Sequence, residues 1–381
     1  MGSQQRESER CKAHGRKIQG HQTWKKKVQW YSTFGEIGVE ERVFLQDRCT
    51  VRPFCSEAGL KVGDYSMPLQ KRMTDFGADV SFARACEKLE EHYGIAVSSS
   101  AERRVTENHA RRMREMESLQ TKIPEKGPMG WIIAQTDGTM VPIVLTDSDG
   151  QEQRCSDRRK NRKVAWQEGR LTLARQKGSA TPVFGATMEG LEQTGNQWLD
   201  CAIRAGLNLG CEIHCLGDGA TWIPDQASRV FGTQASFLVD FYHVCEYLGE
   251  AAQACAPERK ASWLQEQKQN LKTNNVSKVL EALQPHLEPD TRADDKAPIR
   301  KCYRYLTNRL TQIDYQGAIE AGLPIGSGEI ESGNRHVIQQ RLKISGAWWL
   351  KENADNMLAL RTTRANSDWG NYWRQCGEEA A

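Results

Sequence analysis

The sequence has no apolar run of eighteen residues, and its N-terminus lacks the hydrophobic core of a secretory signal peptide. Membrane-spanning helices and export are therefore not predicted, and we expect a soluble, cytoplasmic protein with no membrane partner. Apolar residues make up only 38% of the 381 residues, a low share that still suffices to bury a core. This length allows two or three domains.

The net charge is small, at +3, although 27% of the residues are charged. The basic residues gather in three clusters, within 1–30, 154–177 and 332–364, where acidic residues are few. Separate basic clusters in a nearly neutral chain suit an extended polyanion better than a small anion. Together they favour nucleic acid as a partner, whereas any one of them alone would indicate ordinary solvated surface.

The twelve cysteines show no regular spacing, and without an export signal they do not predict a disulfide framework. Cys11, His14, Cys49 and Cys55 are side chains of the types that bind zinc. Their spacing is too loose for a recognisable zinc ribbon, so structural zinc is not expected.

The N-terminal part divides into a basic arm and a small folded region. Residues 1–30 are polar and predict a disordered arm. From Tyr31 to Leu45 apolar and polar residues alternate, with breaks at Gly35 and Gly38, which predicts a β-hairpin.

Two helices are expected next. Ser81 opens the first, over 81–93, and Gly94 ends it, while Ser99 and Glu102 form a capping box for the second. Two short helices joined by a tight turn are typical of a helix-turn-helix and equally of a plain helical hairpin. We treat residues 31–123 as a DNA-binding region; the candidate contacts on the second helix are Arg103, Arg104 and Arg111.

After a linker at 124–128 the pattern alternates between strands and helices. Strands are predicted at Trp131–Ala134, Val141–Leu145, Val164–Leu173, Cys211–Gly217 and Ser236–Asp240, and helices between them, including 189–205. This alternation predicts an α/β domain over 129–256, with helices on both faces of its sheet.

The C-terminal third is predicted to be helical. Residues 257–320 have apolar residues at helical spacing and no strand pattern. A glycine-rich turn at 324–328 then begins a helix that carries Glu329 and Glu331 in its first turn, within a last segment of the domain over 321–365. Residues 366–381 are expected to be a fraying tail.

Asp137 and Asp218 are each predicted at the end of a strand and before a glycine. Ligands of open α/β sheets gather at the carboxyl ends of strands. A third carboxylate from a later helix would complete an all-oxygen site, which prefers Mg²⁺ or Mn²⁺, and two such ions can promote phosphoryl transfer. For either aspartate alone, a turn or capping role is the simpler interpretation.

Thr136 to Met140 is also similar to the Asp-x-Asp-Gly-Thr motif of haloacid-dehalogenase-type phosphatases. Their nucleophile is an aspartate at the position of Gln135. An amide cannot form an aspartyl phosphate, so that chemistry is excluded.

The order of four motifs is more specific. They are Asp137-Gly138-Thr139, Leu216-Gly217-Asp218-Gly219-Ala220, Asp240-Phe241-Tyr242-His243 and Gly326-Ser327-Gly328-Glu329-Ile330-Glu331. In order and spacing they resemble bacterial insertion-sequence transposases of the DDE type, in particular the ISKra group. The segments Tyr31–Ile37 and Arg341–Trp349 are also similar to sequences of that group, so the resemblance covers roughly residues 30–375.

The resemblance implies a ribonuclease H-like catalytic domain interrupted by an all-helical insertion. It implies catalytic, metal-binding acids at Asp137, Asp218 and Glu331, with Glu329 as a rival for the third position, and a supporting role for Asp240 and His243. Mg²⁺ or Mn²⁺, as two ions, would promote cleavage at transposon ends and strand transfer into target DNA. A nucleoid-associated homodimer or higher oligomer on DNA is implied.

Two alternatives stay open: a catalytically inactive DNA-binding relative and a ribonuclease H-like nuclease that cuts without joining. Trp348 and Trp349 are expected either to stack on a distorted base or to pack against the sheet. The candidate phosphate contacts are Lys160, Arg162, Lys163, Arg335, Arg341 and Lys343.

Overall fold

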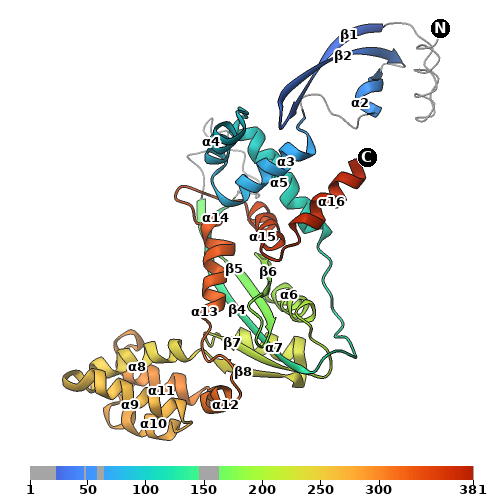
Figure 1. Ribbon diagram of the computed structural model, residues 1–381. Helices are drawn as coiled ribbons and strands as arrows, with labels where there is room; N and C mark the ends of the chain where they lie inside the picture. The colour runs from blue at the N-terminus through green and yellow to red at the C-terminus, as the bar shows by residue number, and fades with distance from the viewer. Residues whose placement is uncertain (1–22, 47–48, 58–63, 146–162, 381) are drawn as a thin grey trace, which may run out of the picture. The chain divides into compact units, whose positions relative to one another are not determined.

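The computed structural model describes residues 23–46, 49–57, 64–145 and 163–380 (Figure 1). The protein is a mixed α/β chain with two compact units. Met1–Met113 and Ser367–Ala381 make up unit 1, and Arg114–Asn366 makes up unit 2.

Unit 1 contains an antiparallel sheet of three strands in the order β1-β2-β3. The strands are β1 (Thr23–Ser32), β2 (Gly35–Gln46) and β3 (Cys49–Val51). The expected hairpin is present, but its first strand begins eight residues before Tyr31, within the segment predicted to be disordered. Lys26 lies opposite Glu41 and Lys27 opposite Glu40. This pairing of unlike charges across the strands explains how so basic a segment joins a sheet.

The helices of unit 1 are α2 (Pro53–Glu57), α3 (Met67–Asp79), α4 (Phe82–Tyr93), α5 (Ser99–Met116) and α16 (Trp369–Ala380). α4 is confirmed with both of its ends: the Ser81 hydroxyl accepts from the amide of Arg84, and Gly94 is left-handed with φ 64°. α3 was not predicted. Its Leu69 packs in one apolar core with Leu89 of α4 and Val105 of α5.

Two details of unit 1 differ from the prediction. α5 is capped by Ser98, whose hydroxyl accepts from the amide of Ala101, rather than by Ser99. Glu102 is consequently inside the helix and buried, where it accepts from the Thr106 hydroxyl at 3.0 Å. The C-terminal residues also form α16 instead of fraying, and Tyr372 and Cys376 of this helix are buried.

Unit 2 is built on a five-stranded mixed sheet in the order β6-β5-β4-β7-β8. β5 pairs antiparallel with both β4 and β6. β7 runs parallel to β4, and β8 runs parallel to β7. The strands are β4 (Gly130–Leu145), β5 (Lys163–Gln176), β6 (Val183–Thr187), β7 (Cys211–Gly217) and β8 (Ala235–Val239).

β4 corrects the prediction of two strands separated by a turn at Asp137. It is continuous because β5 pairs with it from Ile132 to Leu145. Gly138 is thus a strand residue opposite Arg170, and Asp137 projects from the middle of a strand instead of its end. β6 was not predicted.

Helices cover both faces of this sheet. Alternate residues of β4 point to opposite faces, so that Ile132 packs in one core with α6 (Leu191–Arg204) and α7 (Trp222–Phe231), and Ile133 packs in another. The second core joins the sheet to α8 (Phe241–Cys255) and the helices after it.

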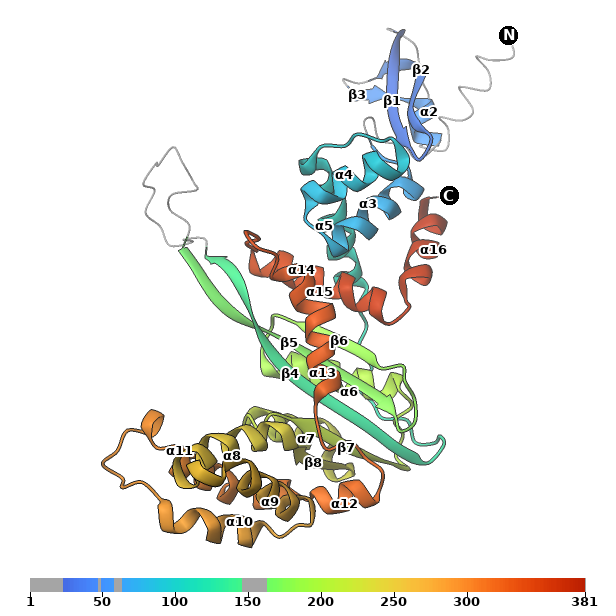
Figure 2. The same cartoon turned by 60° about the vertical axis from the view of Figure 1, so that its left-hand side comes forward.

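The predicted helical stretch is confirmed. Its elements are α9 (Lys260–Lys272), α10 (Val276–Leu283), α11 (Pro298–Thr307) and α12 (Tyr315–Glu320), with short 3₁₀ turns at Pro257–Arg259, Gln284–His286, Asp294–Lys296 and Leu310–Gln312; another lies at Gly232–Gln234. These helices pack together in both views (Figures 1 and 2).

The last part of unit 2 returns to the sheet. α13 (Gly328–Gly333) continues as a π-helix, η6 (Asn334–Gln339), and ends as α14 (Gln340–Leu342). This continuous helix lies along β4 and β5 in both views (Figure 2). α15 (Lys351–Ala365) packs on β6.

Candidate functional site

One face of β4 is directed at the helix that begins at Gly328. Because side chains alternate along a strand, Gln135 and Asp137 share this face. The Gln135 side-chain oxygen accepts from the amide of Ile330 at 3.0 Å, and Asn334 Nδ2 donates to Asp137 Oδ2 at 2.6 Å. Polar side chains of the strand therefore fix both the start and the register of the helix.

The π-helix continues this match of strand and helix. Thr139, the next residue on the same face, accepts from Gln339 Nε2 at 3.3 Å and from Lys343 Nζ at 2.9 Å. A π-helix closes its hydrogen bonds over five residues instead of four. This widening places Asn334 and Gln339, five residues apart, on the side that faces β4.

Asp137 is an unusual carboxylate. Its Oδ1 accepts from the amide of Gly138 at 2.7 Å, and Oδ2 accepts from Asn334. Its pKa is raised to about 6, mainly by burial and also by the negative charges of Asp218 and Glu331, against the lowering effect of the two hydrogen bonds. Asp218 and Glu331 therefore each lie within electrostatic reach of Asp137.

Asp218 follows β7 directly, as predicted. Its Oδ1 accepts from the amide of Ala220 at 2.9 Å, which closes a turn through Gly219 at φ 85°. The Tyr305 hydroxyl donates to the carbonyl of Asp218 at 2.8 Å, and Arg309 donates to that of Gly219 at 2.6 Å. α11 and the residues after it thus hold the turn that presents Asp218.

Asp240 fixes the turn before α13. Its Oδ1 caps α8 by accepting from the amides of Tyr242 and His243 at 2.5 and 3.0 Å. Its Oδ2 accepts from the amide of Ser327 at 2.6 Å and from the Ser327 hydroxyl. The carboxylate is buried and fully engaged, so that it supports the site by position.

His214 is a second anchor of this turn, which the sequence did not reveal. It lies buried on β7, and its Nε2 donates to the carbonyl of Pro324 at 2.8 Å. Burial lowers its pKa, which keeps the ring neutral. The amide of Phe241 donates to the next carbonyl, that of Ile325, at 2.9 Å. A lone histidine in an apolar strand carries no signal for such a role.

His243 has a different environment. Its ring packs edge-on against Tyr247 and Tyr305, with centroid distances of 5.4 and 6.0 Å, and its Nδ1 lies 3.3 Å from Glu246. It belongs to an aromatic cluster between α8 and α11. That cluster reaches Asp218 through Tyr305.

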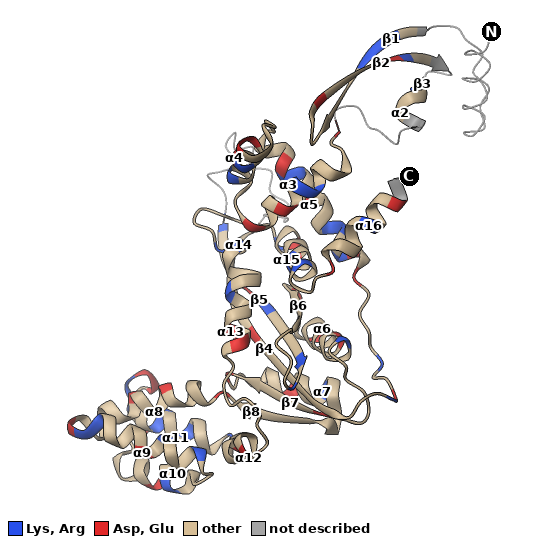
Figure 3. Ribbon diagram, in the orientation of Figure 1, with Lys and Arg blue, Asp and Glu red and all other residues tan. Residues whose placement is uncertain are grey.

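Glu329 and Glu331 differ clearly in their surroundings. Arg175 on β5 donates from Nε to both carboxylate oxygens of Glu329, at 2.8 and 2.9 Å. Glu331 is exposed, and it is the acid of this helix whose charge raises the pKa of Asp137. Figure 3 shows acidic residues in red on α13 and basic residues in blue further along the same continuous helix.

The residues of this site fit a hard divalent cation in type. All three acids supply oxygen, the ligand atom that Mg²⁺ and Mn²⁺ prefer, and the mutual repulsion at Asp137 is what a cation would relieve. Within the described residues no three His, Cys, Asp or Glu side chains are already gathered closely enough to form a ready-made metal group.

The predicted phosphate contacts are distributed unevenly. Arg341 is wrong as a DNA contact: it is 2% exposed and its guanidinium lies 4.8 Å from the centre of the Trp349 ring. Trp349 is buried too, and its backbone amide and carbonyl bond to Pro142 and Val144 of β4, in agreement with the packing alternative. The sequence pattern missed this because a basic helix residue is usually solvated.

The remaining candidates in unit 2 are exposed where they are described. Lys160 and Arg162 lie outside the described residues. Trp348 is half exposed. The exposed basic residues are Lys163 at the start of β5, Arg335 and Lys343. In unit 1, Arg103, Arg104 and Arg111 are exposed on α5.

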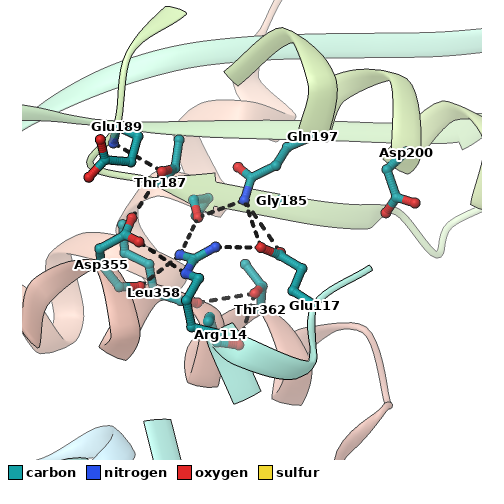
Figure 4. A network of polar contacts seen from close by, with 12 residues as sticks. Arg114, Glu117, Gly185, Thr187, Glu189, Gln197, Asp200, Asp355, Leu358 and Thr362 are labelled. Atoms are coloured by element: carbon teal, nitrogen blue, oxygen red, sulfur yellow. Dashed lines mark hydrogen bonds and ion pairs between the residues drawn. The ribbon is translucent and has the colours of Figure 1, made fainter. Parts of the chain in front are cut away.

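Arg114, in the last turn of α5, belongs to a network inside unit 2 (Figure 4). It forms ion pairs with Glu117 at 2.6 Å and Asp355 at 3.0 Å and donates to the carbonyl of Ala186. Asp355 in turn accepts from the Thr187 hydroxyl at 2.9 Å. Within unit 2 this arginine connects α15 to the edge strand β6, a structural role that its place in an arginine-rich helix concealed.

Of the four candidate zinc ligands, Cys55 is the one whose side chain is described. Cys11, His14 and the Cys49 side chain lie outside the described part of the chain. Cys55 is buried, and its thiol donates to Glu41 at 3.4 Å. Burial raises the pKa of this thiol, and the Glu41 carboxylate raises it further. The described cysteines are all free thiols.

In the comparisons with known proteins, residues 207–377 match the model of an uncharacterised protein family, UPF0236. The match covers less than half of the chain and includes Asp218, Glu331 and Asn334, while Asp137 precedes it. A search of curated proteins found no match. No helix in the described residues is long and apolar enough to span a membrane.

Proposed function

We propose that the protein is a DDE-type insertion-sequence transposase, similar to the ISKra group, in which unit 2 is a ribonuclease H-like catalytic domain and α9 to α12 belong to a helical insertion. The mixed five-stranded sheet and the all-helical stretch support this architecture. The observation that carries the function is the electrostatic effect on Asp137 of the two other acids that the motif order singles out. The charges of Asp218 and Glu331 act on the partly buried carboxylate of Asp137.

In this proposal Asp137, Asp218 and Glu331 hold Mg²⁺ or Mn²⁺, as two ions. The bound cation supplies Lewis-acid stabilisation and an activated oxygen nucleophile. Arg175 keeps Glu329 engaged, which leaves Glu331 as the third acid. Asp240, His214 and Gln135 hold the backbone on which these acids sit.

The reaction has two steps of the same kind. Water attacks the phosphorus atom at a transposon end, a new P–O bond forms, and the bond to the 3′-oxygen breaks, with a proton from the water passing to the leaving 3′-oxygen and the phosphate remaining as a 5′-phosphate end. The freed 3′-hydroxyl then attacks a phosphorus atom of target DNA and releases a second 3′-hydroxyl. Exposed basic residues, among them Arg335 and Lys343, would bind phosphates beside the acids, and α5 would contribute further contacts.

Incubation of the full chain with end-containing duplex DNA, a target plasmid and Mn²⁺ tests this function. The proposal predicts nicked ends and joined products that need the metal. Nicking without joining, even from pre-cleaved ends, would favour a metal-dependent nuclease. Binding of the ends without any cleavage would favour an inactive DNA-binding relative.

A further inference from the structure

Asn334 is buried beside the proposed acids, and only half of its amide is used. The residue is 2% exposed. Its Nδ2 donates to Asp137 Oδ2 at 2.6 Å, whereas its Oδ1 is buried with no hydrogen-bond partner. A buried acceptor without a donor destabilises the folded protein. Such an atom next to a carboxylate is a reason to look for a ligand.

The orientation of this amide follows from chemistry. An ionised carboxylate can only accept hydrogen bonds, so the nitrogen of Asn334 must be the end that faces Asp137. The oxygen is then left as a second acceptor at the same place. Both oxygens, one from a carboxylate and one from an amide, are of the type that a hydrated divalent cation takes as ligands.

The backbone that carries Asn334 has little room to move. A Cβ atom added to the preceding Gly333 would lie 2.9 Å from side-chain atoms of both Leu171 and Phe184. The helix therefore lies as close to the sheet as glycine permits. Asn334 also opens the π-helical stretch, and π-helical bulges are frequent at functional sites.

We propose that Asn334 is the positioning residue of the metal site. Its amide nitrogen orients the Asp137 carboxylate. Its amide oxygen either coordinates a divalent cation or accepts a hydrogen bond from a water bound to that cation. This inference rests on the proposed function, because it takes the same three acids as the metal ligands. Groups that orient metal ligands typically change metal affinity by about 10- to 100-fold when they are removed.

Mn²⁺ titration of the full-length protein, followed by the electron paramagnetic resonance of free Mn²⁺, tests the inference without any DNA. Asn334→Ala should weaken Mn²⁺ binding by about 10-fold or more. Asn334→Asp keeps an oxygen donor and should bind Mn²⁺ at least as tightly as the wild type. The matched control is Gln339→Ala, which removes another contact from the same helix to β4 and should leave the affinity unchanged.

Thermal unfolding in EDTA and in Mn²⁺ separates positioning from simple packing. Asn334→Asp adds a carboxylate beside Asp137, so it should lower the unfolding temperature in EDTA and regain it in Mn²⁺. Equal destabilisation of both Asn334 variants in the two buffers, with wild-type Mn²⁺ affinity, would overturn the inference.

Asp218→Asn distinguishes the failure of this inference from that of the proposed function. If the wild type binds no Mn²⁺, or if Asp218→Asn binds it as well as the wild type, the proposed metal site itself is refuted. If Asp218→Asn abolishes binding but Asn334→Ala does not weaken it, only the role of Asn334 is refuted.

Discussion

Replacing Asp137 by asparagine should stabilise the metal-free protein at alkaline pH. The pKa of Asp137 is about 6, against an ordinary value of 3.8, because burial and two neighbouring acids disfavour the charged form. A carboxyl group whose pKa is raised on folding has its most favourable effect on stability below the unfolded pKa of 3.8, and that stability is lost as the pH rises from 3.8 through about 6. Since one pKa unit corresponds to about 1.36 kcal/mol, the ionised carboxylate costs the folded state roughly 3 kcal/mol at pH 8.

The Asp137→Asn side chain carries no charge at any pH and is nearly the same size. The amide of Asn334 can turn over to present its unpartnered oxygen to the new donor, so that the contact is kept. The gain in the free energy of unfolding should therefore approach, and not exceed, roughly 3 kcal/mol at pH 8. At pH 4.5 the folded carboxyl is mostly protonated while the unfolded one is mostly ionised, so the gain should fall to about 1 kcal/mol.

Urea denaturation in EDTA at the two pH values measures this difference. Asp225→Asn, at an exposed position of α7, is the control and should show no comparable dependence on pH. An Asp137→Asn protein that is no more stable than the wild type at pH 8, or equally stabilised at both pH values, would refute the electrostatic description of the site.

Three further substitutions test the framework around the acids. Gly333→Ala should lower the free energy of unfolding by about 1–3 kcal/mol in urea denaturation, because a methyl group overpacks the contact with β5 and β6; Gly249→Ala, in open space on α8, should not. Ser327→Ala removes the hydroxyl donor to buried Asp240 and should cost about 1–3 kcal/mol, and an unchanged urea midpoint would contradict that bond. Gly219→Ala forces a side chain into a left-handed position crowded by α11 and should destabilise by at least about 1 kcal/mol, with loss of Mn²⁺ binding; wild-type binding would show that the turn tolerates change.

Local patterns were enough for those elements whose signals lie within a few residues. Ser81 and Gly94 mark the ends of α4 correctly, and Asp218 follows its strand as expected. The capping role of Asp240 at α8 is also the simplest interpretation of an aspartate before a helix. In each case neighbouring residues in the chain make the contact that defines the feature.

Predictions failed where the deciding partner is distant in sequence. β4 continues through Gly138 because β5 pairs with it, and Arg341 is buried because Trp349 folds back onto β4. Asn334 and His214 carry no local pattern at all. Their roles come from Asp137 and Pro324, more than one hundred residues away in each case.

Single-turnover cleavage of end-containing DNA in Mg²⁺ by Glu331→Gln and Glu329→Gln tests whether Asp137, Asp218 and Glu331 form a metal site for DNA cleavage. We predict that Glu331→Gln abolishes cleavage while still binding the DNA, and that Glu329→Gln, which loses its ion pair with Arg175, retains measurable cleavage. Full cleavage by Glu331→Gln, or its loss in Glu329→Gln alone, would contradict the assignment.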